Sequence, residues 1–445
     1  MKVIIIGGVA AGTSAAAQMM RNDSDTEAVL YVADRDISYS SCGIPYYLGD
    51  KLELTDIVPR TPASFEEKYG IRVLTGHKVT GIDPKEKKIR GEQTDGTAFE
   101  DSYDALVIAT GARPVLPDVP GVDRDNVRML RTIEDTRRMM DDLNHSDTKH
   151  VVIVGTGFIG LEVLENLCAR DDLKVTVLNR SDKITPHLDE DMAKHLEERL
   201  QSYDIDLRKN TSIQKITDAG ADTGDEIIPA DLILFATGTA PNVELAEAAG
   251  VEIGETGAIV VDAQMRTNVK DIYACGDCAQ LWNVLDDHPM HVPLGTSANK
   301  TGKICGDVIT GGNLKFHGIL GTSIFRLFDL TIGATGYTEK QARELGYEVE
   351  VICQESLHRA GYFDGEKMLI KAVVDRKSAR LLGAQLIGTH GIDKRLDVLI
   401  TVITNQMDGE SIYNLDLAYA PPYSTVNDAV HYIGLKLMSL EGSDA

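Results

Sequence analysis

The fold is decided by the stretch Val151-Val152-Ile153-Val154-Gly155-Thr156-Gly157-Phe158-Ile159-Gly160. Its first four residues form a continuous apolar run, which is typical of a buried parallel strand. The glycines that follow have the spacing G-x-G-x-x-G, which allows a tight turn, a close backbone approach to a pyrophosphate and close packing of the next helix. The stretch therefore predicts a Rossmann-like nucleotide-binding module, with nucleotide contacts at Gly155, Gly157, Phe158, Ile159 and Gly160.

The N-terminus repeats this plan in a looser form. The apolar run Lys2-Val3-Ile4-Ile5-Ile6 leads into Gly7-Gly8-Val9-Ala10-Ala11-Gly12, and residues 13–20 predict a helix of small side chains. The fingerprint expects an acidic residue about 20 positions later to hold a ribose. Val32 stands there, so we take Asp34, the nearest acid, as the candidate. The predicted nucleotide residues of this module are Gly7, Gly8, Ala10, Ala11, Gly12 and Asp34.

Further nucleotide contacts are expected where other strands end. Two apolar strands end in Ala-Thr-Gly, at residues 109–111 and 236–238, so the two modules share a plan. A short strand ends in Gly276-Asp277, where a carboxylate can accept hydrogen bonds from a polyol, and a helix starts near Pro293. The cofactor residues predicted from these strand and helix ends are Thr110, Gly111, Gly238, Gly276, Asp277, Pro293, Gly295 and Thr296.

The residues after the second strand of the 151–160 module predict which nucleotide it binds. About 20 positions beyond Gly160 stand Asn179, Arg180 and Ser181, with Lys183 close behind. An acid there suits the 2′-hydroxyl of NAD, whereas an arginine suits the 2′-phosphate of NADP. We therefore predict NADPH, with NADH as the alternative, and contacts from Asn179, Arg180 and Lys183.

The candidate nucleophile is Cys42, within Ser41-Cys42-Gly43-Ile44-Pro45. Gly43 and Pro45 suit a turn into a helix, and a helix start or a nearby cation is the usual means of activating a thiol. The alternative is a small buried apolar side chain. Cys275 and Cys278 form a C-x-x-C, which we do not assign as a redox pair because it interrupts the Gly-Asp element.

Composition narrows the choice of partners. The chain has 445 residues, 43% of them hydrophobic, and a formal net charge of -24, which disfavours nucleic acid and anionic membranes. Its six cysteines are scattered, unlike a secreted disulfide scaffold, so we expect the reducing cytoplasm. We find no membrane-spanning run, and we predict no metal site. From about residue 321 the pattern changes to paired strands, at 323–328, 330–334, 368–374 and 380–387, with helices at 339–345 and from 393 and 411.

The two modules, Gly276-Asp277, Cys42 and Tyr419-Ala420-Pro421-Pro422-Tyr423 together resemble the flavin-dependent pyridine nucleotide-disulfide oxidoreductases over the whole chain. That resemblance implies an α/β fold with two Rossmann-like domains, for FAD and NAD(P), and a C-terminal α+β dimerisation domain. The implied boundaries are residues 1–112 and 242–320 for the FAD domain, 113–241 for the NAD(P) domain and 321–445 for dimerisation.

Within that family, Ser38-x-x-Ser41-Cys42-Gly43-x-Pro45-Tyr46 resembles the single-cysteine branch of NADH oxidases, NADH peroxidases and coenzyme A-disulfide reductases. The oxidases and peroxidases typically carry a histidine where Val9 or Ala10 stands here. That difference and the basic segment at residues 180–184 favour the coenzyme A-disulfide reductases. The resemblance then implies a homodimer in which tyrosines from the partner subunit act at Cys42. Its implied residues are the catalytic Cys42, Tyr362, Tyr419 and Tyr423, Ser41 at the flavin, and Ser38 and Tyr39 at the substrate. Coenzyme A carries phosphates, so an acidic protein needs local cations to bind it, and Arg21 and Arg60, near the first nucleotide helix and the Cys42 segment, are the candidates.

Three alternatives stay open from the sequence. An NAD(P)H oxidase or peroxidase would cycle Cys42 through sulfenic acid. A coenzyme A-dependent persulfide or polysulfide reductase shares every motif above. A redox-sensing flavoprotein without catalysis is the third, and rapid turnover of any disulfide would exclude it.

Overall fold

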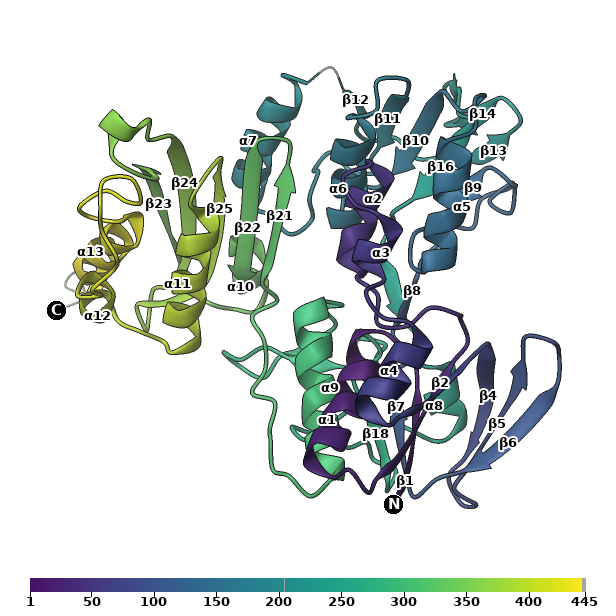
Figure 1. Ribbon diagram of the computed structural model, residues 1–445. Coiled ribbons are helices and arrows are strands. Elements are labelled where there is room, and N and C mark those ends of the chain that lie inside the picture. The colour runs from purple at the N-terminus through teal and green to yellow at the C-terminus, as the bar shows by residue number, and fades with distance from the viewer. Residues whose placement is uncertain (204, 442–445) are drawn as a thin grey trace.

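The computed structural model describes residues 1–203 and 205–441, which are arranged around three five-stranded sheets (Figure 1). The first sheet has the order β18-β7-β1-β2-β3, and all its neighbouring strands are parallel. Its apolar β-branched runs are buried, as expected of strands covered on both faces. Its strands are β1 (Lys2–Ile6), β2 (Glu27–Val32), β3 (Arg72–Thr75), β7 (Ala105–Ile108) and β18 (Ile272–Ala274), and helices α1 (Ala10–Asn22) and α9 (Gly295–Ile309) pack against each other beside it.

The second sheet repeats this parallel arrangement in the order β12-β11-β10-β16-β9. In both sheets a glycine turn joins the central strand to a helix, here β10 (His150–Val154) to α6 (Phe158–Leu167). The other strands are β9 (Val127–Arg128), β11 (Lys174–Leu178), β12 (Asp206–Arg208) and β16 (Leu232–Phe235), accompanied by α5 (Ile133–Leu143) and α7 (Glu190–Leu200).

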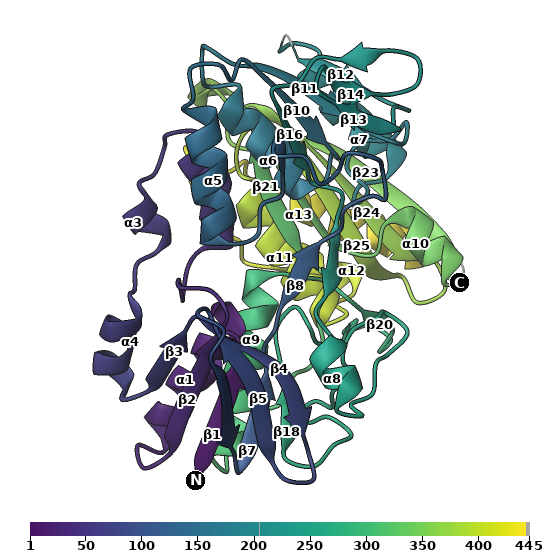
Figure 2. The ribbon, with the colours of Figure 1, turned by 90° about the vertical axis from the view of Figure 1, so that its right-hand side faces the viewer.

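Two segments cross between the first and second sheets, and they pair with each other. Residues 113–121 are rich in proline and glycine, but the segment begins within a strand. β8 (Ala112–Pro114) pairs antiparallel with β17 (Thr239–Pro241), because two crossing segments side by side can satisfy each other's backbone groups. Figure 2 shows β8 running between the two sheets.

The third sheet is antiparallel, in the order β21-β22-β25-β24-β23. The predicted strand pair is present as β21 (Ser323–Leu327) and β22 (Leu330–Gly336). The edge strand β23 (Val349–Leu357) and the last helix α13 (Ala429–Glu441) were not predicted. The module also contains β24 (Lys367–Asp375), β25 (Arg380–Gly388), α10 (Glu339–Glu344), α11 (Ile392–Thr404) and α12 (Gly409–Tyr413).

Short elements fill the remaining described chain. The helices are α2 (Ile44–Leu48), α3 (Leu54–Ile57), α4 (Pro62–Tyr69) and α8 (Glu244–Ala248), with 3-10 turns at Ser41–Gly43 and Gly361–Phe363. The strands are β4 (His77–Asp83), β5 (Lys88–Gln93), β6 (Ala98–Ser102), β13 (Lys215–Thr217), β14 (Gly220–Asp222), β15 (Ile227–Ile228), β19 (Leu281–Trp282) and β20 (Pro289–Met290).

A buried charge cluster fastens the second module to the third. The Lys371 ammonium group lies 2.8 Å from an Asp191 carboxylate oxygen, 2.8 Å from Glu339 and 3.3 Å from Asp189. Asp189 also accepts a 2.6 Å hydrogen bond from the Gln385 side chain. Because a buried cation needs such compensation, this cluster fixes how helix α7 sits on strands β24 and β25.

Candidate active site

Cys42 is exposed in the 3-10 turn Ser41–Gly43, immediately before helix α2. Pro45 occupies the first turn of α2, as the sequence predicted. The turn is held by backbone hydrogen bonds from Ser40 to Ile57 (2.8 Å) and from Gly43 to Ser40 (3.1 Å). Helix α2 packs against α6, so the fold places an accessible thiol beside the helix that follows the second glycine turn.

The charges around Cys42 oppose its ionisation. Although part of the Cys42 side chain is exposed, the surrounding protein partly desolvates its sulfur. This desolvation, followed by the carboxylates of Glu162 and Asp277, raises the pKa of the Cys42 thiol, and Arg131 works in the opposite direction. Burial and the neighbouring Glu165 raise the pKa of Glu162 itself to about 7. The surroundings provided by this chain therefore favour the neutral thiol, and a thiolate needs help from groups that bind at the site.

We expect the substitution Glu162→Gln to lower the pKa of Cys42, because it removes a carboxylate that disfavours the thiolate. The pH dependence of alkylation at Cys42, followed on its own peptide, should move to lower pH. Glu190→Gln, an exposed change at the start of α7, is the matched control. An unchanged or more alkaline profile for the Glu162 variant would contradict this electrostatic account.

The first glycine turn is shaped for a dinucleotide. A Cβ on Gly7 would overlap the carbonyl oxygen of Ala109, and a Cβ on Gly12 would overlap that of Gly7. The turn therefore lies directly against the end of β7 and leads into the first turn of α1. Gly276 packs on Ala11 and donates its backbone N–H to the Thr301 hydroxyl (3.0 Å).

These residues converge at the carboxyl ends of parallel strands, which is where open α/β sheets bind nucleotides, so they fit FAD. Thr110, which precedes Gly111, donates its hydroxyl to the Asn242 carbonyl oxygen (2.7 Å). Asp277 accepts a 2.9 Å hydrogen bond from Arg131, a partner that the sequence did not predict. Pro293 precedes helix α9, and Gly295 and Thr296 lie in its first turn.

Val32, at the usual acidic position, is buried under the glycine turn, where a Cβ on Gly8 would meet its side chain 2.5 Å away. Asp34, two residues beyond β2, is exposed. Burial of its carboxyl group and the charges of Asp135, Asp36 and Glu134 raise the pKa of Asp34. Its proposed ribose contact stays a prediction.

The second glycine turn has the same geometry as the first. A Cβ on Gly155 would overlap the carbonyl oxygen of Ala236, and a Cβ on Gly160 would overlap that of Gly155. Gly157 and Gly238 border open space within 4 Å, which leaves room for a ligand at the end of β16. Phe158 stacks on His187, with ring centroids 4.4 Å apart, and Ile159 is exposed.

The predicted role of Asn179 needs correction. Its side chain is buried, bonds Thr156 through Oδ1 (2.9 Å), and donates through Nδ2 to the carbonyl oxygens of Ser181 (2.8 Å) and Lys183 (2.9 Å). The amide thus shapes the loop and has no spare group for a nucleotide. Arg180 is exposed and forms no ion pair with the described carboxylates, so it is available to a phosphate.

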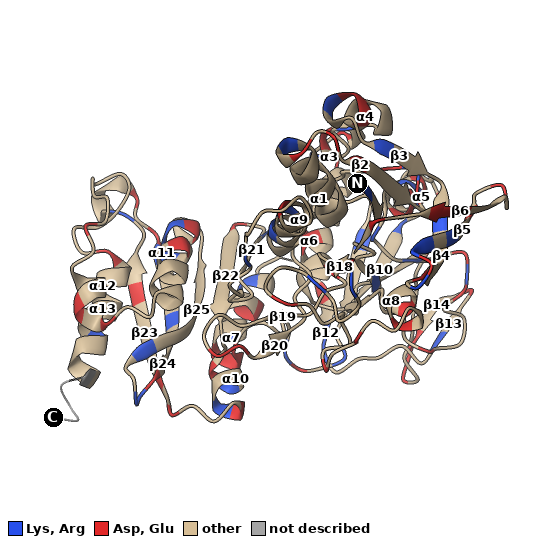
Figure 3. Ribbon diagram, turned by 90° about the horizontal axis from the view of Figure 1, so that it is seen from below, with Lys and Arg blue, Asp and Glu red and all other residues tan. Residues whose placement is uncertain are grey.

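The two predicted arginines lie in a cationic cluster, defined here as Arg21, Arg60 and Lys68 around the Tyr69 ring. Their charged groups lie 5.7, 5.8 and 5.3 Å from the ring centroid. Although burial works against it, Arg60, Lys68 and Arg21 lower the pKa of Tyr69. None of the three cations pairs with a carboxylate in the described chain. Figure 3 shows basic residues on α4, which carries Lys68 and Tyr69, neither of them predicted.

Tyr39 also needs correction, because it is 8% exposed and packs in a hydrophobic core. Burial, followed by the charge of Asp34, raises the pKa of Tyr39 to about 12. We therefore assign it to packing. Ser38 donates its backbone N–H to the Gly8 carbonyl oxygen (2.8 Å) and so joins this loop to the first glycine turn.

The predicted tyrosines lie in the third module. Tyr362, Tyr419 and Tyr423 are 76%, 48% and 72% exposed. Their hydroxyl groups have no hydrogen-bond partner among residues 1–203 and 205–441. Helices α12 and α13 lie at the end of the molecule away from α2 (Figure 1). The structure therefore does not bring these tyrosines to the Cys42 of the same chain.

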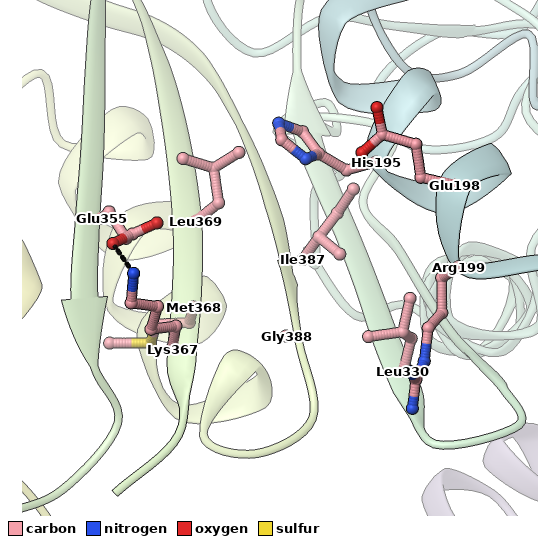
Figure 4. Close-up of a pocket in the computed structure, with 10 residues that line it drawn as sticks. All are labelled: His195, Glu198, Arg199, Leu330, Glu355, Lys367, Met368, Leu369, Ile387 and Gly388. Carbon is pink, nitrogen blue, oxygen red and sulfur yellow. Dashed lines mark ion pairs between the residues drawn. The ribbon is translucent and has the colours of Figure 1, made fainter. Parts of the chain in front are cut away.

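A hollow of about 430 Å³ lies between α7 and the third sheet (Figure 4). His195, Glu198 and Arg199 line one side, and Leu369 and Ile387 the other. It contains none of the predicted site residues. In the described part of the chain no helix is long and apolar enough to cross a membrane, and no group of side chains suits a metal ion.

Two dinucleotide modules, an accessible thiol beside them and a third antiparallel module define a flavoprotein oxidoreductase that uses a pyridine nucleotide. Residues 1–298 match the family model described as pyridine nucleotide-disulphide oxidoreductase, and residues 322–430 match its dimerisation domain. The chain belongs to this family, whose cofactors are FAD and NAD(P)H.

Among curated relatives, the chain is 34% identical to a coenzyme A disulfide reductase of Staphylococcus haemolyticus, over 99% of this chain and all of that protein. It is 33% identical to an NADH oxidase of Methanocaldococcus jannaschii, over 96% of each chain.

Solved structures share the fold. A NAD-dependent persulfide reductase from A. fulgidus is 37% identical, with a TM-score of 0.95 over 100% of this chain and 84% of that one. An engineered water-forming NADPH oxidase bound to NADPH is 26% identical, with a TM-score of 0.94 over all of both chains.

Proposed function

We propose that this protein uses NADPH to reduce coenzyme A disulfide, or a related low-molecular-weight disulfide, through Cys42. The observation that carries the proposal is the exposed Cys42 thiol next to α6. Cys275, Cys278 and Cys305 are fully buried, so they offer no second accessible thiol near the first sheet. A single cysteine suffices when the substrate itself contains the second sulfur.

Bound FAD supplies the route by which a hydride from NADPH becomes the electron pair that cleaves a disulfide. The Cys42 thiolate attacks one sulfur of the substrate, so that a new S–S bond joins Cys42 to one half and the other half leaves as a thiolate. Two electrons then break this mixed disulfide, which frees the second thiol and restores the Cys42 thiolate. The net reaction converts NADPH, one proton and one disulfide into NADP⁺ and two thiols.

The cationic cluster supports a phosphate-bearing substrate. In a chain of formal net charge -24, cations without carboxylate partners are available to an anion. Coenzyme A carries phosphates, whereas most small disulfides do not. Arg21 lies in the last turn of α1, and the rest of the cluster lies in the segment that follows Cys42. The proposed phosphate-binding residues and the proposed nucleophile therefore both come from the N-terminal part of the chain.

We expect the double substitution Arg21→Ala and Arg60→Ala to raise the KM for coenzyme A disulfide on the order of tenfold or more, because charge-assisted hydrogen bonds to phosphate contribute about 1.5–3 kcal/mol each. The KM for an uncharged disulfide should stay the same. Arg90→Ala removes a surface arginine already paired with Glu100 and is the control. Equal losses with both disulfides would count against a phosphate site.

NADPH is supported by Arg180, which stands free in the loop after β11. The engineered NADPH oxidase carries substitutions that replace consecutive Asp, Ala and Met residues by Ala, Arg and Ser, and this chain has the same Arg-Ser pair at Arg180 and Ser181. The persulfide reductase from A. fulgidus, by contrast, is NAD-dependent, so the nucleotide preference of this protein needs a direct measurement.

Arg180→Ala should raise the KM for NADPH about tenfold and leave the KM for NADH unchanged, since only NADPH has a 2′-phosphate for the guanidinium to bind. Lys209 is a nearby cation that already pairs with Glu197 (2.9 Å) and Asp182 (3.1 Å), so Lys209→Ala is a suitable control. If Arg180→Ala affects the two nucleotides alike, this arginine does not discriminate between them.

The proposed assembly is a homodimer in which Tyr362, Tyr419 and Tyr423 of one subunit face Cys42 of the other and donate protons to departing thiolates. Their exposure, the unpaired hydroxyls and the family of residues 322–430 support it. The proposed domains are those implied by the sequence, with residues 1–112 and 242–320 sharing the first sheet through β18. The six free cysteines support a cytoplasmic location.

The competing functions differ in the acceptor. The chain resembles a persulfide reductase and an NADH oxidase as well as a disulfide reductase. NADPH oxidation should first be measured anaerobically with coenzyme A disulfide, coenzyme A persulfide and polysulfide as acceptors. Oxygen and peroxide should then be tested as acceptors in separate assays. We expect the highest kcat/KM with coenzyme A disulfide. A higher kcat/KM with persulfide would identify the protein as a persulfide reductase, and a higher kcat/KM with oxygen or peroxide would identify it as an oxidase or peroxidase.

A further inference from the structure

We infer that Arg395 is a positioning residue that holds the two tyrosine loops in one fixed arrangement, an inference that rests on the proposed action of these tyrosines at the partner's thiol. The tyrosine loops are residues 358–366, with Tyr362, and residues 414–428, with Tyr419 and Tyr423. They are separated in sequence by β24, β25, α11 and α12, yet a single side chain on α11 binds both.

Arg395 is 1% exposed, so its guanidinium lies wholly inside the third module. It donates to the carbonyl oxygen of His358 at the base of the first loop (2.9 Å) and to that of Gly391 (3.2 Å). It also donates to the Ser424 hydroxyl (3.2 Å) and to both oxygens of Asp428 (3.2 and 2.7 Å) in the second loop. The planar guanidinium thus joins the two loops directly.

Further contacts make the two loops one unit. Ser424 donates its hydroxyl to Asp428 (2.8 Å), immediately after Tyr423. The backbone N–H of Ala360 bonds the Pro421 carbonyl oxygen (3.3 Å), which links the loops across their middle. Lys394 donates to the carbonyl oxygen of Ala418, next to Tyr419 (3.2 Å).

The tyrosine loops are anchored by the buried Arg395 side chain, whereas the tyrosines that they carry are exposed. Replacing a buried ion pair by apolar residues is often neutral or stabilising, so such a pair is weak evidence for a role in stability. In some proteins a buried pair instead specifies one geometry. Here the geometry specified is that of three exposed tyrosines without hydrogen-bond partners in the described chain. Arg395 cannot touch a substrate itself, so its effect must pass through the loops.

The first test uses Arg395→Met and the milder Ser424→Ala, in case the arginine variant does not fold. Hydrogen exchange should increase together in residues 358–364 and 417–424. The kcat/KM for coenzyme A disulfide should fall about 10- to 100-fold, as expected when reacting groups are misplaced by about 1 Å. NADPH-dependent reduction of ferricyanide, which needs no tyrosine, should stay within about twofold, because the nucleotide modules are untouched. Folded variants with unchanged exchange, or with unchanged disulfide turnover, would overturn the inference.

The second test uses mixed dimers, co-expressed with two affinity tags, of one Arg395→Met subunit and one Cys42→Ser subunit. The Arg395→Met subunit retains the Cys42 thiol, and the Cys42→Ser subunit retains both tyrosine loops in their ordered arrangement. Each mixed dimer then has one complete site, so we expect about half of wild-type turnover per dimer. Inactive mixed dimers would overturn positioning across the interface. If the wild-type protein reduces no disulfide, the proposed function fails, and the exchange measurement alone decides whether Arg395 holds the loops.

Discussion

Cys42→Ser should lose disulfide reductase activity by on the order of 10³-fold or more, because it removes the thiol proposed to form the mixed disulfide. The flavin and the NADPH-dependent reduction of ferricyanide should both be retained, since neither involves the thiol. Steady-state turnover of coenzyme A disulfide under anaerobic conditions is the measurement.

Two other exposed cysteines provide matched controls for this prediction. Cys168 follows helix α6 and Cys353 lies in the edge strand β23. Replacing either by serine should leave turnover unchanged. Substantial disulfide turnover in Cys42→Ser, or a comparable loss in either control, would contradict the assignment of Cys42.

The variant Gly12→Ala should be purified without bound flavin. An added methyl group would overlap the carbonyl oxygen of Gly7, and the turn that carries the cofactor would have to open. The bound flavin is measured from the visible spectrum of the purified protein and from FAD released on denaturation.

Gly155→Ala is the change chosen in the second module, because Gly155 has a φ of +110° and a methyl group there would overlap the carbonyl oxygen of Ala236. This variant should retain its flavin, which dithionite would reduce but NADPH would not. The pair thus separates the two nucleotide sites. Flavin loss in both variants, or in neither, would contradict the assignment of FAD to the first turn and NADPH to the second.

The parts of this protein that the sequence predicted are those encoded by contiguous residues. Both glycine turns, their strands and the turn into α2 follow from local patterns, because each is marked by a motif of about ten consecutive residues. Steric constraints at the glycines explain why G-x-x-x-x-G at Gly7 and G-x-G-x-x-G at Gly155 build one geometry.

The sequence did not predict contacts between residues that are distant along the chain and close only in the folded structure. Arg131, Glu162 and Arg395 come from segments far from Cys42 or from the tyrosine loops, and no spacing in the sequence marks them. Lys68 could have been considered from the sequence, because it is a cation a short distance after Arg60, and the structure places it in the last turn of helix α4. The edge strand β23 was missed because its side chains are mostly half-buried or exposed and show weak alternation.

Residue type alone also misassigned two side chains. Asn179 occupies the nucleotide-discriminating position, but its amide is consumed by the loop that it shapes. Tyr39 lies next to the Cys42 segment in sequence, but its side chain is buried in a hydrophobic core. In both cases burial, which the sequence does not show, decides between ligand contact and structural support.

The most direct test of the central claim is to detect the mixed disulfide itself. The protein with Cys42 as the free thiol and its flavin oxidised should be treated anaerobically, in the absence of NADPH, with one equivalent of coenzyme A disulfide, alkylated, and mapped by peptide mass spectrometry. We predict one coenzyme A attached per chain at Cys42, with Cys168 and Cys353 alkylated instead, and loss of the adduct when NADPH is added. An absent adduct, or one at Cys168 or Cys353, would contradict the account.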